Sequence, residues 1–332
     1  MSDLTAVVDI DYIKYTAASA GETRTIKAYH PIDGIEFEAK TRTELWGHYL
    51  KKDKGILAEF NKKNGTDYKA DELVVIDLQH PEPVQNILHT AKSMFESLLW
   101  NLKTNRYTAY IGKGESWRVG RSTILEYKGN RKEMLKPLLL DDVTEYLIKK
   151  YKPEIVEYYE SDDKVVMDAY RDKSKVVCGV DKDYLGCDVL VFNPNKVDQG
   201  VIDCEGLGSL WLDSKGKVTG KGRIFFYHQV LSGDTSDNYA ANSASDIEWG
   251  EKSSYKLLKD CQTDKEALEA LKKGYQLIYP ETKVIKSWKG NDIEVDWKYV
   301  FNENWDMARM LRWENDVVVG TDVLDKFGLL GD

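Results

Sequence analysis

The 332-residue sequence predicts an α/β protein built on a mostly parallel sheet. Short apolar runs have the length of buried strands and lie at residues 5–10, 107–111, 155–159, 175–180 and 189–192. Segments in which apolar residues recur at helical spacing alternate with several of these runs and lie at residues 84–102, 139–151 and 162–170. Strands that alternate with helices favour a parallel sheet, whose ligands bind beyond the carboxyl ends of the strands.

Two further regions complete the predicted order of elements. Residues 21–80 combine a predicted hairpin around Pro31–Gly34, a lysine-rich stretch near Lys51–Lys63 and an apolar run at Leu73–Leu78, and we interpret them as an elaboration of the core. Beyond residue 220 the sequence predicts mainly helices, with a turn at Trp249–Lys252 and a late amphipathic helix around Trp305–Trp313.

Composition limits the classes of function. Lys plus Arg number 47 and Asp plus Glu number 56, so the net charge is −9, which argues against a protein that coats nucleic acid non-specifically. The four cysteines, Cys178, Cys187, Cys204 and Cys261, show no C-x-x-C spacing, as expected of a reduced cytoplasmic protein. No apolar stretch approaches the ~18 residues of a membrane span, so we expect neither secretion nor membrane insertion.

Carboxylates follow the predicted strands at successive positions. The first strand ends at Asp9 and Asp11, and the later groups are Glu160-Ser161-Asp162-Asp163, Asp181-Lys182-Asp183 and Gly233-Asp234-Thr235-Ser236-Asp237-Asn238. Read alone, these groups are a well-capped helix, an ordinary turn and a polar loop. Their joint order favours a site for Mg²⁺ or Mn²⁺, because carboxylates brought together repel one another without a cation.

A basic segment stands out against the acidic whole. Seven basic residues and three acidic residues lie between Lys113 and Lys136, together with the aromatic residues Trp117 and Tyr127. Such a segment is either a solvated helix face with its aromatic rings in the core or a phosphate-facing patch whose rings stack on unpaired bases. Beside an acidic metal cluster it fits phosphodiester hydrolysis, in which two metal ions activate water and neutralise the leaving oxygen.

Other catalytic arrangements have little support in the sequence. It contains no G-x-S-x-G, no P-loop and no G-x-G-x-x-G after a strand. The five histidines lack the spacing of zinc ligands, and we interpret them as structural or surface residues: His30, His48, His80, His89 and His228.

These motifs, in this order, resemble the flap endonuclease and 5′→3′ exonuclease family, particularly its bacteriophage members. The resemblance is carried by Val-Val-Asp9-Ile-Asp11, Trp117-Arg118, Tyr127-Lys128-Gly129-Asn130-Arg131-Lys132 and the three later acidic motifs. It implies a PIN-like nuclease core over residues 1–220, with 21–80 as an atypical insertion and 113–150 as the arch region. Residues 221–332 would form a helix-three-turn-helix that binds duplex DNA, followed by C-terminal helices.

The resemblance also implies roles for individual residues. Asp9, Glu160 and Asp162 would hold the first metal, with Asp163 in or beside the shell, and Asp181, Asp183 and Asp234 would hold the second, with Asp237 nearby. Lys128 and Arg131 would contact the scissile phosphate, supported by Arg118. The residues expected to contact DNA are Trp117, Arg121, Tyr127, Lys132, Gly250, Lys252 and Ser253. The cofactors implied are two Mg²⁺, with Mn²⁺ as a substitute, and K⁺ at the helix-three-turn-helix.

Two positions depart from the family pattern. An acid usually follows the strand that here ends at Ile111, but this chain reads Gly112-Lys113-Gly114-Glu115. Either Glu115 substitutes from a shifted position, or the first metal site has lost a ligand and gained the cation of Lys113. The second departure is Ala240-Ala241-Asn242-Ser243, where a Pro-Gly-Val-like turn is more usual, and it weakens the expectation of K⁺.

The resulting hypothesis is a metal-dependent 5′→3′ exonuclease with 5′-flap or RNA-primer-removing activity, serving phage DNA replication or DNA breakdown in the host cytoplasm. Its partners would be DNA with a 5′ end or flap, an RNA–DNA hybrid and replication proteins, with no membrane. The alternative is a DNA 5′-end or junction binding protein of the same fold whose catalysis is impaired. A PIN-type ribonuclease is a third option, disfavoured by the Tyr-Lys-Gly-Asn-Arg segment.

Overall fold

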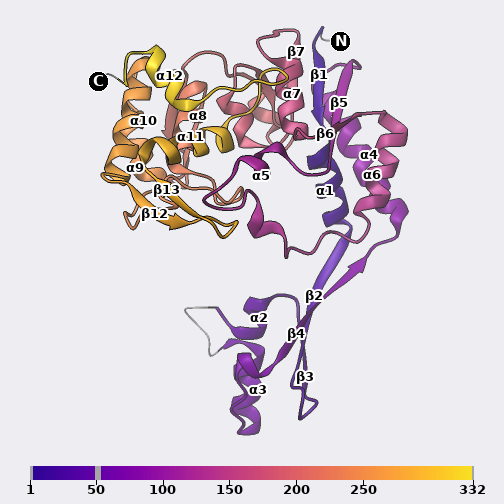
Figure 1. Cartoon of the computed structure of the whole chain (residues 1–332). Coiled ribbons are helices and arrows are strands. Elements are labelled where there is room, and N and C mark those ends of the chain that lie inside the picture. Colours follow the sequence, from indigo (N-terminus) through magenta and orange to yellow (C-terminus); the bar gives the residue numbers. More distant parts are fainter. Residues whose placement is uncertain (1–2, 49–53, 331–332) are drawn as a thin grey trace. The chain divides into compact units, whose positions relative to one another are not determined.

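The computed structural model describes residues 3–48 and 54–330 and forms two compact units. The first unit comprises residues 1–12, 95–135 and 151–332, and the second comprises residues 13–94 and 136–150. Each unit has its own sheet and is described by itself (Figure 1). Part of the predicted lysine-rich stretch, residues 51–53, lies outside the described residues.

The first unit is built on a six-stranded sheet with the order β6-β5-β1-β7-β8-β9. Its strands are β1 (Thr5–Asp9), β5 (Tyr107–Lys113), β6 (Glu154–Glu157), β7 (Lys175–Cys178), β8 (Leu190–Phe192) and β9 (Val201–Asp203). All neighbours pair in parallel except β8 and β9. The apolar residues of β1 are fully buried, as expected for a central strand covered on both faces. The predicted α/β class and mostly parallel sheet are confirmed.

Short helices connect these strands. The helix α7 (Ser161–Ala169) follows β6 and packs its buried Val165 and Val166 with Val7 and Val177 of the sheet. Before it, α5 (Trp117–Arg121) follows β5 and begins at Ser116, whose side chain accepts a hydrogen bond from the backbone N–H of Arg118. Because β1, β5, β6 and β7 run in parallel, the segments that follow them begin at one edge of the sheet.

The rest of the first unit is mainly helical, as predicted. Its helices are α8 (Arg223–Ser232), α9 (Glu251–Leu258), α10 (Asp264–Ile278), α11 (Trp297–Ala308) and α12 (Gly320–Lys326). Two hairpins accompany them, formed by β10 (Ser209–Leu212) with β11 (Val218–Lys221) and β12 (Lys283–Lys286) with β13 (Asp292–Val295). The helix predicted around Trp305–Trp313 begins earlier, because Asp296 caps α11, and it ends where Arg309 adopts an extended conformation.

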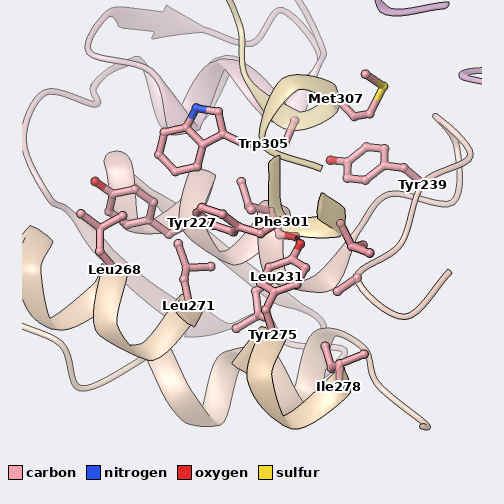
Figure 2. Packing of buried hydrophobic residues seen from close by; sticks show 14 of the residues in the cluster. Tyr227, Leu231, Tyr239, Leu268, Leu271, Tyr275, Ile278, Phe301, Trp305 and Met307 are labelled. Carbon is pink, nitrogen blue, oxygen red and sulfur yellow. Dashed lines mark hydrogen bonds between the residues drawn. The ribbon is translucent and has the colours of Figure 1, made fainter. Parts of the chain in front are cut away.

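A large apolar core joins α8, α10 and α11 (Figure 2). Leu231, Tyr275 and Phe301 meet there and are fully buried, and each such side chain stabilises the fold by roughly 1.5–3 kcal/mol through the area it removes from water. The polar end of Tyr275 is satisfied, because its hydroxyl donates to the carbonyl of Val230 (2.6 Å) and accepts from Asn304 (2.9 Å). This core fixes α8, α10 and α11 against one another.

The second unit contains a three-stranded antiparallel sheet, in the order β3-β2-β4, which confirms the predicted hairpin. Its strands are β2 (Glu22–Tyr29), β3 (Glu36–Ala39) and β4 (Val74–Pro81), and its short helices are α2 (Arg42–Trp46) and α3 (Ile56–Asn64). Phe37, Leu45 and Leu57 form a separate small core. The helix α6 (Leu140–Tyr151) and most of α1 (Ile10–Ala20) and α4 (Val84–Asn101) also belong to this unit. None of the described helices has the length and apolar character required to cross a membrane.

Candidate metal centre

Asp9, the last residue of β1, is a buried acid of the site and is 7 % exposed. Its Oδ1 accepts hydrogen bonds from the backbone N–H of Asp11 (2.9 Å) and the hydroxyl of Ser161 (2.9 Å), and its Oδ2 accepts from the hydroxyl of Tyr184 (3.1 Å). Burial, and then repulsion from Asp11, raises the pKa of Asp9 to about 7. No Lys or Arg among the described residues forms an ion pair with Asp9, so its negative charge lacks a protein cation.

The start of α7 carries the predicted acidic triad. Glu160 is the N-cap, and one carboxylate oxygen from each of Glu160, Asp162 and Asp163 lies within 4.8 Å of the others. This group could hold a metal ion, since hard divalent cations prefer carboxylate oxygens. Burial, and then the charges of Glu160 and Asp163, raises the pKa of Asp162 well above its usual range. An added cation would relieve that repulsion.

Asp163 is already bound by protein groups on both oxygens. Arg118 donates to Oδ2 through Nη1 and to Oδ1 through Nη2, each at 2.8 Å, in a bidentate pair. The indole of Trp117 donates to Oδ2 (3.1 Å) and the backbone N–H of Leu311 donates to Oδ1 (3.0 Å). Because Asp163 is fully buried and Arg118 is only 2 % exposed, this pair anchors the start of α7. We therefore place Asp163 beside the metal shell, where it supports Glu160 and Asp162.

Glu160 receives two cations and a phenol. Arg118 donates to its Oε2 (2.6 Å), Tyr127 donates to the same oxygen (2.9 Å), and the ammonium of Lys128 donates to Oε1. Burial alone would raise the pKa of Glu160, but the charges of Lys128 and Arg118 outweigh it and lower the pKa to about 2. Glu160 is therefore ionised at neutral pH, and its pKa is shifted in the direction opposite to that of its neighbour Asp162.

The predicted phosphate-contacting segment is fastened to the acidic loop at 234–238. The backbone N–H of Lys128 donates to the carbonyl of Asp237 (3.0 Å), and Asn130 donates to the carbonyl of Thr235 (2.7 Å). Arg131 bonds the carbonyl of Ser236 (2.9 Å) and the carboxylate of Asp237 (2.8 Å). Lys128 has φ 55°, a left-handed conformation that strains a non-glycine residue. Lys128 and Arg131 thus border the carboxylates, and their contact with a scissile phosphate remains a prediction.

A second group of acids comes from two places in the chain: Asp181 and Asp183 follow the strand β7, whereas Asp234 follows the helix α8 and not a strand, contrary to the prediction. The ammonium of Lys182 bridges Asp183 Oδ1 (2.7 Å) and Asp234 Oδ2 (2.5 Å), and Gln229 also donates to Asp183. Burial opposes ionisation of Asp234, but the hydrogen bond from Lys182 and those from Ser236 lower its pKa to about 2. The side chain of Asp181 is exposed to solvent on one side, and desolvation by the protein around it, followed by the charge of Asp183, raises its pKa to about 7. Lys182 therefore provides the positive charge that these acids require.

The residues expected to contact DNA divide into buried and exposed sets. Tyr127 is 4 % exposed and its hydroxyl donates to Glu160 and to Asp237 (3.0 Å), so its ring packs inside the protein, whereas base stacking would require an exposed face. Trp117 is half-buried and is held by its bond to Asp163. The basic side chains of this set are exposed and comprise Arg121, Lys132 and Lys252, the last in the first turn of α9, where it lies beside Gly250 and Ser253.

The cation that stands where the family pattern has an acid, Lys113, is the last residue of β5. Lys113 pairs with Glu157 (3.2 Å), its partner on β6, and both side chains are exposed. Glu115 is exposed on the loop that follows β5. The charge of Lys113 is therefore compensated by a neighbouring strand.

Sequence reasoning missed three groups that orient the acids: the hydroxyls of Ser161 and Tyr184, which bond Asp9, and the indole of Trp117, which bonds Asp163. Tyr184 follows the Asp181-Lys182-Asp183 motif directly and Ser161 lies inside the triad motif, so each was adjacent to a predicted ligand. The sequence around these groups could not show which distant side chains they bond.

The donor set fits divalent metal ions of the magnesium class. All candidate ligands are carboxylate oxygens, the ligands such ions prefer. Burial, and then the charges of neighbouring carboxylates, raises the pKa values of Asp9 and Asp162. The ammonium of Lys182 lies between Asp183 and Asp234 as a cation does between two ligands. The acidic group at the start of α7 could hold one such ion, and the ligand sets that the sequence predicts for two ions remain predictions.

Comparisons with known proteins find a likeness among solved structures. Neither the protein-family models nor the curated proteins contain a match to the sequence. Among solved structures, the chain is similar to the T5 D15 protein co-crystallized with metal ions, with 14% sequence identity and a TM-score of 0.45. That alignment covers 98% of this chain and 98% of the other.

Proposed function

We propose that this protein is a divalent-metal-dependent nuclease that hydrolyses DNA from 5′ ends. The single observation that supports this function is the convergence of Asp9, the start of α7, the Asp181–Asp183 motif and the 234–238 loop beside Lys128 and Arg131. Such an arrangement offers anionic ligands for metals and cations for a phosphate at one edge of the sheet. In finer terms we propose a 5′→3′ exonuclease with 5′-flap and RNA-primer-removing activity.

The chain's own residues have distinct tasks in this proposal. Asp9, Glu160 and Asp162 would hold one Mg²⁺ ion, and Asp181, Asp183 and Asp234 would hold a second; when bound, the ions would supply Lewis-acid activation of water and neutralisation of charge on the leaving oxygen. Arg118 and Asp163 hold α7 in register, so that Glu160 and Asp162 keep their positions. Lys128 and Arg131 stabilise charge on the scissile phosphate, and both already contact carboxylate oxygens at the border of the site.

Duplex binding is assigned to residues 221–332. The start of α9 presents Gly250 and the exposed Lys252, and the unpaired N–H groups of a helix N-terminus favour phosphate. Arg121 and Lys132 extend the basic surface on the 113–136 segment. We propose that K⁺ at this motif, if bound, supports phosphate contact by the same backbone.

The competing function, DNA-end binding without catalysis, was suggested by Lys113 at the end of β5. Its ammonium pairs with Glu157, both exposed, and Asp9, Glu160 and Asp162 remain in place. The enzyme is therefore the function that the geometry supports best.

The test is cleavage of 5′-labelled duplex and 5′-flap DNA with Mg²⁺, with and without a chelator, by the wild type and by Asp162→Asn and Asp181→Asn. Asp322→Asn, an exposed acid in the first turn of α12, is the matched control. We expect Mg²⁺-dependent product from the wild type and the control, and strongly reduced product from the other two. Chelator-resistant cleavage, or full activity in both site variants, would contradict the proposal. DNA binding without turnover would favour the end-binding protein.

A further inference from the structure

Asp11 lies over the end of β5, although it belongs to the start of α1. Its backbone N–H donates to Oδ1 of Asp9 (2.9 Å), and its own Oδ1 accepts the backbone N–H of Gly112 (3.1 Å). The strand β5 thus holds the carboxylate of Asp11, while the carboxylate of Asp9, at the end of the neighbouring strand β1, holds its backbone N–H. A first-turn acid that only capped α1 would not need the contact with β5.

Gly112 is the residue that makes this placement fit. A Cβ atom at position 112 would lie 2.8 Å from Oδ2 of Asp11, closer than side chains tolerate, and 3.7 Å from the backbone nitrogen of Ser161. The Asp11 carboxylate therefore fills the space that a side chain at 112 would occupy. Because that space adjoins Ser161, it also adjoins the turn of α7 that carries Asp162.

We propose that Asp11 is an additional ligand of the first metal ion, supplying from α1 the carboxylate that β5 does not provide. The segment after Ile111 reads Gly-Lys-Gly, and the next acid, Glu115, is exposed on the following loop. The backbone N–H of Asp11 donates to Asp9. The Asp11 carboxylate and the backbone nitrogen of Ser161, at the start of α7, both border the space next to Gly112. The proposal rests on the proposed metal-dependent function and concerns Mg²⁺ or Mn²⁺ bound through oxygen.

Asp11→Asn separates a ligand from a merely positioning residue. Asparagine keeps an oxygen that accepts the Gly112 N–H and keeps the backbone bond to Asp9, but it removes the charge. A complementary double variant, the transposed variant, combines Asp11→Ser with Gly112→Asp. The first substitution removes the carboxylate next to position 112, and the second places a carboxylate there from the strand β5.

The experiment measures Mn²⁺ affinity by calorimetry and by the electron paramagnetic resonance of free Mn²⁺, without DNA, with folding checked by circular dichroism. We expect Asp11→Asn to weaken the tighter site at least about tenfold, Asp322→Asn to match the wild type, and the transposed variant to recover most of the affinity lost in Asp11→Ser.

Two results would overturn the inference. If Asp11→Asn binds Mn²⁺ like the wild type while Asp162→Asn does not, Asp11 is no ligand and the proposed function stands. If the transposed variant folds and binds no better than Asp11→Ser, the place above Gly112 is not part of the site. Absence of Mn²⁺ binding by the wild type would instead remove the proposed function and the inference with it.

Discussion

Replacing Arg118 by alanine should destabilise the first unit more than any exposed-arginine variant. The guanidinium is 2 % exposed and bonds Asp163 twice, Glu160 once and the backbone carbonyl of Arg309. Its removal leaves Asp163, which is fully buried, with only the donors from Trp117, Leu311 and its own helix cap. A buried carboxylate without its cation is costly.

The expected loss is about 3–5 kcal/mol, the cost of breaking a buried ion pair by removing one partner. At about 2 °C per kcal/mol for a chain of this size, the melting temperature should fall by roughly 6–10 °C. Arg118→Lys should lose less unfolding free energy than Arg118→Ala, because lysine keeps the positive charge. Some loss should remain, because an ammonium cannot bond both oxygens of Asp163 as the guanidinium does. Asp163→Asn in the Arg118→Ala background should recover part of the loss, since the orphaned charge is then removed.

The assay is thermal and urea unfolding monitored by circular dichroism at pH 7.5, with Arg171→Ala as the control. Arg171 also pairs with an aspartate, Asp188, but its side chain is 56% exposed, so its removal should cost less than about 1 kcal/mol. If Arg118→Ala unfolds within 1 kcal/mol of the wild type, or no more easily than Arg171→Ala, the buried pair does not anchor α7 and the account of the triad is wrong.

Three other predictions follow from charges at the site. Lys182→Met should tighten Mn²⁺ binding several-fold in a titration, because the ammonium that bridges Asp183 and Asp234 no longer competes with the ion; unchanged or weaker binding in a folded variant would contradict this. The metal-free protein should lose stability as pH rises from about 5 to 8, because Asp9 has a pKa of about 7 in the folded state against 3.8 as the ordinary value, so the folded state binds more protons in that window. Melts in EDTA should show this fall, and Asp9→Asn should reduce it; a rise in stability over the same range would refute the burial argument. Tyr127→Phe should lower the turnover rate but leave DNA affinity within about twofold, because the hydroxyl bonds Glu160 and Asp237 inside the protein. A large loss of DNA affinity with normal turnover would instead indicate that Tyr127 stacks on bases.

Five of the six strands of the main sheet contain a short apolar run that the sequence predicts, but β9 was not predicted, and Asp234 and Asp237 follow the helix α8 and not a strand. Asp9, Glu160 and Asp181 come at the ends of runs, and parallel pairing of β1 with β5 and β7 places those ends at one edge. The same local pattern could not show that Arg118 pairs with Asp163, because partners 45 residues apart carry no common periodicity.

The burial of individual side chains was the second feature that the sequence could not predict. Tyr127 lies in a basic, polar segment whose local pattern suits an exposed face, yet contacts with distant Glu160 and Asp237 bury it. The sequence also could not show which carboxylate lies next to Gly112, the residue after Ile111. That carboxylate belongs to Asp11, 101 residues away. Local pattern also placed the late helix too far along the chain, since its aromatic spacing continues past the break at Arg309.

The most direct measurement is anomalous diffraction from a crystal soaked in Mn²⁺. The account predicts one peak in contact with carboxylate oxygens of Asp9 and Asp162, with Asp11 among its ligands, and a second between Asp183 and Asp234 with Lys182 displaced. Well-ordered carboxylates with no anomalous peak among them, or a peak only at acids far from this edge of the sheet, would contradict it.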